Sequence, residues 1–146
     1  MKTTIAVLAM LTFAAAPAWA VLGGSVDSVQ ADQARLEAKA RIVPLPGYIV
    51  HEISRGDGTT IKEFVSPLGT VFGISWKGPT MPDLTPLLGT YYSEFHQAVA
   101  GRRHRGPVVV RTKDLVVESG GHLRAFYGRA YVTSLIPNTL SPAVVQ

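Results

Sequence analysis

The strongest hydrophobic periodicity in the chain lies between residues 84 and 99. Apolar side chains recur there at spacings of three and four residues, at Leu84, Leu87, Leu88, Tyr91, Tyr92, Phe95 and Val99. This period is that of one face of a helix. Asp83 is a suitable N-cap and Gly101 a natural end. We therefore expect a helix here whose Leu and Tyr side chains belong to the core rather than to a ligand-binding aromatic cluster.

A weaker helical pattern runs from Ser25 to about Lys39. Ser25 can act as an N-cap, and a narrow apolar stripe is formed by Val26, Val29, Leu36 and Ala40. Pro44 and Gly47 then predict a connecting segment, because proline ends a helix and glycine favours a turn. The sequence thus predicts a first helix over 25–39.

Between and after these helices, short apolar runs separated by turn residues predict strands. The expected strands are 48–53, 60–65, 70–76 and 108–112, followed by two more within 114–132. Asp57-Gly58 and Pro67 with Gly69 are typical hairpin and turn residues. These runs predict antiparallel meanders.

The segment 114–132 combines a hairpin pattern with polar residues beside the expected turn. Two apolar runs flank Gly120 and Gly121, and glycine readily reaches the positive φ that a tight turn requires. We expect these two glycines to form the turn. Ser119 would then face His122 across it, within hydrogen-bond reach.

Together these elements predict an α+β fold in which two helices pack on an antiparallel sheet of about six strands. The order suggests a pseudo-repeat of one helix and three strands in each half, of about 60 residues. We expect a single domain over 21–146, with an irregular C-terminal tail from about residue 134, where Pro137 and Pro142 occur.

Residues 1–20 have the pattern of a cleaved signal peptide. Lys2 precedes an apolar run, and residues 17–20 end in the small residues that a signal peptidase recognises, which predicts cleavage after Ala20. The run is shorter than the roughly 20 residues that a membrane-spanning helix needs. We therefore expect a periplasmic or secreted protein without a transmembrane segment after cleavage.

Composition narrows the classes of function further. The chain has no cysteine, which excludes disulfides, thiolate metal sites and a cysteine nucleophile. Its net charge is +4, or +3 without Lys2, and the basic residues gather at Arg102, Arg103 and Arg105. This loop could bind an anionic surface such as lipid phosphate or cell-wall acid groups. Export argues against nucleic acid as a partner.

Candidate chemistry is sparse. His51, His96, His104 and His122 are far apart in sequence and show no metal-ligand spacing, so no metal site is predicted. The glycines at 120–121 precede no helix, so no phosphate-binding loop or cofactor is expected. Ser119 with His122, aided by Glu118 or Asp114, is the only local pairing that resembles a hydrolase.

Motifs spread over nearly the whole chain resemble one family. They are Leu22-Gly-Gly-Ser25, Tyr48-x-Val-His-Glu52, Glu63-Phe-Val-Ser-Pro67, Val71-Phe72, Trp76-x-Gly-Pro79, Pro82-Asp-Leu84, Leu88-Gly89, Ser119 to Phe126 and Gly128-Arg-Ala-Tyr131. The chain resembles the exported proteobacterial proteins grouped as domain of unknown function 2844. The resemblance implies no activity.

Three hypotheses about function remain. The preferred one is a non-catalytic envelope protein that binds another protein or a cell-surface component through His122, Arg124 and Arg129, joined by Glu118 or Glu63. The second is a small hydrolase using Ser119 and His122. The third is binding to an anionic surface through Arg102, Arg103 and Arg105. Oligomeric state stays open.

Overall fold

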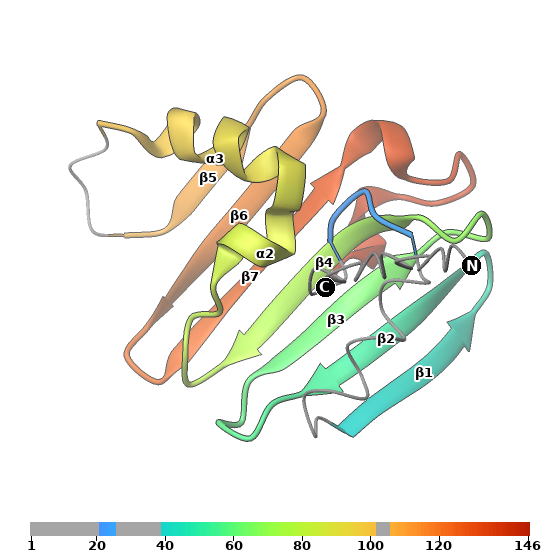
Figure 1. Ribbon diagram of the computed structural model, residues 1–146, viewed down its shortest axis with the longest axis horizontal. Helices are drawn as coiled ribbons and strands as arrows, with labels where there is room; N and C mark the ends of the chain where they lie inside the picture. Colours follow the sequence, from blue (N-terminus) through green and yellow to red (C-terminus); the bar gives the residue numbers. More distant parts are fainter. Residues whose placement is uncertain (1–20, 26–38, 102–105) are drawn as a thin grey trace, which may run out of the picture.

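The architecture is one twisted antiparallel sheet (Figure 1). The computed structural model describes residues 21–25, 39–101 and 106–146. Its strands are β1 (Lys39–Leu45), β2 (Tyr48–Ser54), β3 (Thr60–Val65), β4 (Val71–Gly78), β5 (Val108–Arg111), β6 (Leu115–His122) and β7 (Ala125–Val132). They form a seven-stranded sheet in the order β1-β2-β3-β4-β7-β6-β5. Two meanders therefore meet where β4 pairs with β7.

One continuous helical segment connects the two meanders. It consists of α2 (Leu84–Leu88), a 3-10 turn η1 (Gly89–Tyr91) and α3 (Tyr92–Val99). The Asp83 side chain caps its start by accepting a hydrogen bond from the Thr85 N–H at 2.9 Å. In Figure 1 the segment crosses one face of the sheet over β5, β6 and β7. No helix among the described residues has the length and apolar character needed to cross a membrane.

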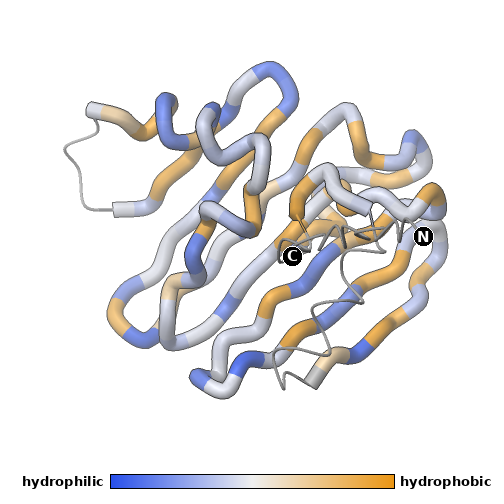
Figure 2. Tube along the Cα trace, in the orientation of Figure 1, coloured by the Kyte–Doolittle hydropathy of each residue, from blue (hydrophilic) through white to orange (hydrophobic). Residues whose placement is uncertain are grey.

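The sheet separates two cores, because successive strand residues point to opposite faces. Figure 2 shows the resulting alternation of hydrophobic and hydrophilic positions along the strands. The core on the helix side includes Ile74, Trp76, Leu88, Leu115 and Val117. The smaller core on the other side is built around Val50, Phe64, Phe72, Val116, Tyr131 and Val145. Each face is thus buried in part by a different segment of the chain.

The C-terminal segment forms the cover of this second face at one end of the sheet. It contains the 3-10 turns η2 (Thr133–Leu135) and η3 (Pro142–Val144), and Leu135, Ile136 and Leu140 pack against the second core. Val145 is fully buried and lies over Gly73, where a Cβ atom would be 2.6 Å from Val145 Cγ2. A glycine is required at 73 because the valine occupies that space.

The described N-terminal residues 21–25 pack into the body of the protein. Leu22 is 1% exposed and its N–H donates to the Leu87 carbonyl at 3.1 Å. Gly23 and Gly24 exchange hydrogen bonds with Val71, and Ser25 forms an isolated bridge with Thr70. This short segment therefore ties the helix to the start of β4.

The expected fold of two helices on about six strands is wrong. All six expected strands exist, the first four within two residues of their expected bounds and the last two displaced by about three residues at the turn between them, but β1 makes the seventh. The expected helix over 25–39 lies mostly outside the described residues, and at its ends Ser25 bridges to Thr70 while Lys39 begins a strand. The expected pseudo-repeat is also wrong, because four strands precede the helical segment and three follow it.

The missed strand β1 contains Pro44, which argued for a connection. β1 pairs only with β2 among the described strands, and an edge strand tolerates proline because one side of its backbone needs no ladder partner. The connection is only Pro46-Gly47, where Gly47 has a φ of 85°. Proline followed by a glycine with positive φ is typical of a type II turn.

The expected Gly120-Gly121 turn is also wrong, since both glycines lie within β6. Gly120 pairs with Tyr127 and Gly121 with Phe126, so the chain reverses at Leu123-Arg124. Arg124 accepts the left-handed conformation with a φ of 66°. Position 121 requires a glycine because a side chain there would overlap the Ala125 carbonyl.

Candidate binding groove

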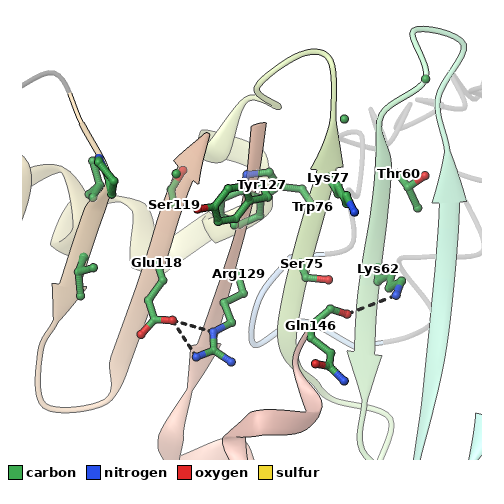
Figure 3. A pocket seen from close by; sticks show the side chains of 17 residues that line it. Thr60, Lys62, Ser75, Trp76, Lys77, Glu118, Ser119, Tyr127, Arg129 and Gln146 are labelled. Carbon is green, nitrogen blue, oxygen red and sulfur yellow. Dashed lines mark hydrogen bonds and ion pairs between the residues drawn. The ribbon is translucent and has the colours of Figure 1, made fainter. Parts of the chain in front are cut away.

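An open groove lies on the face of the sheet opposite the helix, beside the part that the C-terminal segment covers. Its volume is about 1040 Å³. Figure 3 shows side chains of β3, β4, β7 and β6 along its floor and Gln146 at its edge. The residues that line it are Gly58, Thr60, Lys62, Ser75, Trp76, Lys77, Gly78, Pro107, Val108, Val109, Glu118, Ser119, Gly120, Tyr127, Gly128, Arg129 and Gln146.

Strand register arranges the floor into two rows that run across the strands. The first row consists of Thr60, Lys77, Tyr127 and Gly120, each directly opposite the next, and the second consists of Lys62, Ser75, Arg129 and Glu118. Neighbouring strands lie about 4.8 Å apart, and positions i and i+2 about 6.6 Å apart. The two rows therefore present a grid of side chains on one surface.

Tyr127 is the aromatic residue of this surface, and it remains 57% exposed. Its ring lies over Gly120, where a Cβ atom would come within 3.0 Å of the tyrosine hydroxyl and 3.1 Å of Cζ. The ring rests on Gly120 because that position has no side chain. In Figure 3 the ring extends from β7 toward β6.

Arg129 is held in place by three contacts. Its Nε donates to Glu118 Oε2 at 2.8 Å, and one Nη to the Val145 carbonyl at 3.3 Å. The guanidinium carbon lies 5.8 Å from the centre of the Tyr131 ring, in a cation–π arrangement. Glu118 also accepts a 2.7 Å hydrogen bond from Arg111. The carboxylate thus joins β5, β6 and β7.

The lysines of the groove are less constrained than Arg129. Lys62 Nζ donates to the main-chain oxygen of Gln146 at 3.3 Å. Lys77 is exposed and forms no ion pair within the part of the chain that the structure describes. With Arg129, the lining holds three basic side chains against one acidic side chain, Glu118. The groove therefore favours an anionic ligand.

A hydrogen-bonded turn fixes the end of the groove near Gly58. Asp57 Oδ1 accepts from the Thr59 N–H at 2.8 Å, and Asp57 Oδ2 accepts from the Thr80 hydroxyl at 2.6 Å. The hydrogen bond from Thr80 lowers the pKa of Asp57 most, and the bond from the Thr59 N–H lowers it further. The ionised carboxylate connects the β2–β3 turn to the loop after β4, so both sides of this end are held together.

The family of this chain follows from a match over nearly its whole length. Residues 18–145 match the family described as "Protein of unknown function (DUF2844)". The chain belongs to the DUF2844 family. No curated protein and no solved structure gives a significant match. The family assignment from the sequence motifs is confirmed, and it carries no activity with it.

In this DUF2844 chain Ser119 and His122 do not face each other. Both lie on β6, three residues apart, because the turn comes after His122. That spacing corresponds to about 10 Å along a strand, and an odd spacing turns the side chains to opposite faces. The Ser119 hydroxyl donates to Met81 Sδ at 3.8 Å, and His122 Nδ1 lies 3.3 Å from the Leu123 carbonyl oxygen.

The other predicted site residues of the DUF2844 chain are dispersed. Arg124 lies in the exposed turn, while Arg129 is five positions further along and lines the groove. Glu118 joins Arg129, as one alternative anticipated. Arg102, Arg103 and Arg105 lie outside the described residues, as does His104. Among the expected site residues that the structure describes, Arg129 and Glu118 come together.

His51 and Glu63 form a second polar feature, buried on the helix side of the sheet. They are directly opposite on β2 and β3, and they are 3% and 2% exposed. Burial lowers the pKa of His51, which favours the neutral ring. Its Nδ1 makes no hydrogen bond with other described residues. Within the described ranges, no three His, Asp or Glu side chains gather as a metal site would require.

Lys62, Lys77 and Tyr127 of the groove were missed by the sequence reasoning. Their signal was the alternation of Tyr127, Arg129 and Tyr131, which puts large polar-tipped side chains on one face of β7. With the turn placed at Gly120-Gly121, Tyr127 and Arg129 were not expected opposite Gly120 and Glu118. Lys62 and Lys77 could be placed beside that face only by the β4–β7 pairing, which joins the two meanders.

Glu118→Gln should lower the free energy of unfolding by about 1 kcal/mol, because the amide replaces a carboxylate that binds two arginines at a partly exposed site. Urea unfolding at low and high salt measures this change. The loss should shrink at high salt, where the ion pairs are screened. Glu94→Gln on α3 is the matched control, and an equal loss in both variants would contradict the role given to Glu118.

Proposed function

We propose that the protein is a non-catalytic, exported binding protein of the cell envelope, and that the groove on its open sheet face binds a cell-surface component. The observation that carries this proposal is the groove itself. It is concave, large for a single small ligand, and lined by an exposed aromatic ring and basic side chains. These are features of a recognition surface.

Export is part of the proposal and is supported by the leader pattern of residues 1–20. Cleavage after Ala20 would retain Leu22, which is 1% exposed and belongs to the core. Removal of the leader would leave intact every hydrogen bond that ties residues 22–24 to Leu87 and Val71. The mature chain would retain the described core.

The hydrolase alternative receives no support from the geometry of β6. A serine nucleophile requires a base within hydrogen-bond reach, and the Ser119 hydroxyl is bonded to Met81 instead of His122. The groove contains Glu118, but that carboxylate is already bound by Arg111 and Arg129. Binding therefore accounts for the groove better than catalysis.

Site-specific photo-crosslinking in cells tests the proposal. A photoreactive amino acid at position 60, in the groove, should give adducts with an envelope component, whereas one at exposed position 113 should not. Adding Tyr127→Ala should strongly reduce the adducts at position 60. Mass spectrometry of the exported protein should give Val21 as its first residue. Equal labelling at both positions, or a chain retained in the cytoplasm with residues 1–20, would refute the proposal.

A further inference from the structure

We infer that the ligand of the groove is an acidic polysaccharide, with Tyr127 stacking on a sugar ring and Lys77 binding the acid group of that sugar. This inference rests on the proposed function and specifies the ligand of the same site. Three features lead to it: the kind of surface on which the groove lies, the exposed tyrosine face, and the position of the cations.

The floor of the groove lies on the face of the sheet, and Val108 and Val109 of the edge strand β5 line one side of it. Floor strands β3, β4, β7 and β6 each have paired neighbours on both sides, so their backbone N–H and C=O groups are used within the ladder. An extended peptide adds to a sheet through free backbone groups at an edge. This floor offers side chains only, which disfavours recognition of a peptide backbone.

Tyr127 provides a flat platform for a ring. Its ring rests on Gly120 and the side chain is more than half exposed, whereas the other aromatic side chain that lines the groove, Trp76, is buried. A tyrosine combines a broad apolar ring with a polar hydroxyl, which suits the C–H face of a sugar and its hydroxyl groups. A single-stranded nucleic acid would instead use several aromatic platforms for successive bases.

Lys77 is directly opposite Tyr127 in the sheet. Directly opposed residues have Cβ atoms about 5 Å apart. The Tyr127 ring leans the other way, over Gly120, so a sugar stacked on it would meet the lysine by the edge of its ring that faces β4. In a uronic acid the carboxylate projects from that edge. Lys62 lies one strand and one row away from Lys77. Its ammonium group donates one hydrogen bond to Gln146 and has further N–H groups for an acid group of the next sugar. Thr60 and Ser75 add hydroxyl groups beside the lysines.

The size of the groove suits more than one sugar unit. Its volume of about 1040 Å³ lies at the upper end of the range for small-ligand pockets, about 300–1,000 Å³. Its lining also extends across the sheet, from Thr60 and Lys62 on β3 to Val108 and Val109 on β5. An oligosaccharide can therefore enter laterally and continue beyond the groove.

Binding of polygalacturonate and alginate oligosaccharides by the purified protein, measured by calorimetry, tests the inference. Wild type should bind at least one of them, and more weakly when polygalacturonate is fully methyl-esterified, since the ester retains the rings without the charges. Tyr127→Ala should weaken binding about tenfold. Lys77→Gln should weaken binding of the acid about fivefold and leave binding of the ester unchanged. Lys113→Gln, an exposed lysine outside the groove, should have no effect.

The outcomes separate the ligand class from the proposed function. Equal affinity for the acid and its methyl ester would overturn the role of Lys77 and the acidic character of the ligand. Preference for poly-glutamate over both glycans would assign the groove to an acidic peptide. Binding of neither glycan would overturn the inference, while groove-specific crosslinking at position 60 would still support an envelope-binding protein with another ligand.

Discussion

Replacing Leu22 with alanine should lower the free energy of unfolding by about 2–5 kcal/mol, the range found when a buried leucine is truncated and a cavity remains. Leu22 is 1% exposed and belongs to the core beneath the helix. Its backbone would keep the hydrogen bond to Leu87. The loss would therefore report the packing of the side chain, and it can be measured by urea unfolding monitored by Trp76 fluorescence.

Leu68→Ala is the matched control for this substitution. Leu68 is 93% exposed in the turn between β3 and β4, so the same chemical change should alter stability by less than about 0.5 kcal/mol. A Leu22→Ala protein as stable as the Leu68→Ala protein would show that residues 21–25 do not contribute to the core. It would also remove the structural support for a mature chain that begins at Val21.

Gly128→Ala should destabilise the protein by about 1–3 kcal/mol, the usual cost of forcing extra volume into a packed core. Gly128 pairs with Trp76 across the β4–β7 boundary. A Cβ atom at 128 would lie 2.5 Å from Trp76 Cε2 and 2.7 Å from the Glu118 carbonyl oxygen. Because one neighbour is backbone, the indole and the strand cannot both move away freely. Thermal or chemical unfolding measures the loss.

Two variants make this prediction specific. Gly56→Ala adds the same methyl group where no atom lies within 4 Å, so it should be nearly neutral. Trp76→Leu removes part of the clashing ring, so the cost of Gly128→Ala should be smaller in that background, with a coupling energy of about 0.5–3 kcal/mol. Additive effects of the two substitutions would mean that Trp76 does not set the requirement for glycine.

Local patterns predicted most of the elements but not their assembly. The period of 84–99 indicated the helix, and alternation with turn residues located six strands. Gly89 in the middle of that helix has a φ of 51° and allows Val21 to pack where a side chain would otherwise be. This contact depends on a distant segment, so the helical period alone could not predict the 3-10 turn there.

The errors arose where tertiary contacts give a residue its role. Pro44 indicated a break, but at an edge strand its missing N–H costs little. Gly120 and Gly121 indicated a turn, but they are required by the Tyr127 ring and by the Ala125 carbonyl. In both cases the residue type was informative, and the partner that explained it lay on a neighbouring strand. The second error also prevented prediction of the groove, because a misplaced turn shifts the register of β6 against β7 and gives Tyr127 and Arg129 the wrong partners.

Because the groove spans the β4–β7 pairing, it forms only at a late stage of folding. β4 ends at Gly78 and β7 begins at Ala125, so this pairing closes a far longer stretch of chain than the hairpins on either side. Contacts between residues distant in sequence form late, because a large loss of chain entropy precedes them. Lys77 comes to lie beside Tyr127 only when the two meanders join. A nascent or partly folded chain therefore lacks the binding surface, even when both hairpins have already formed.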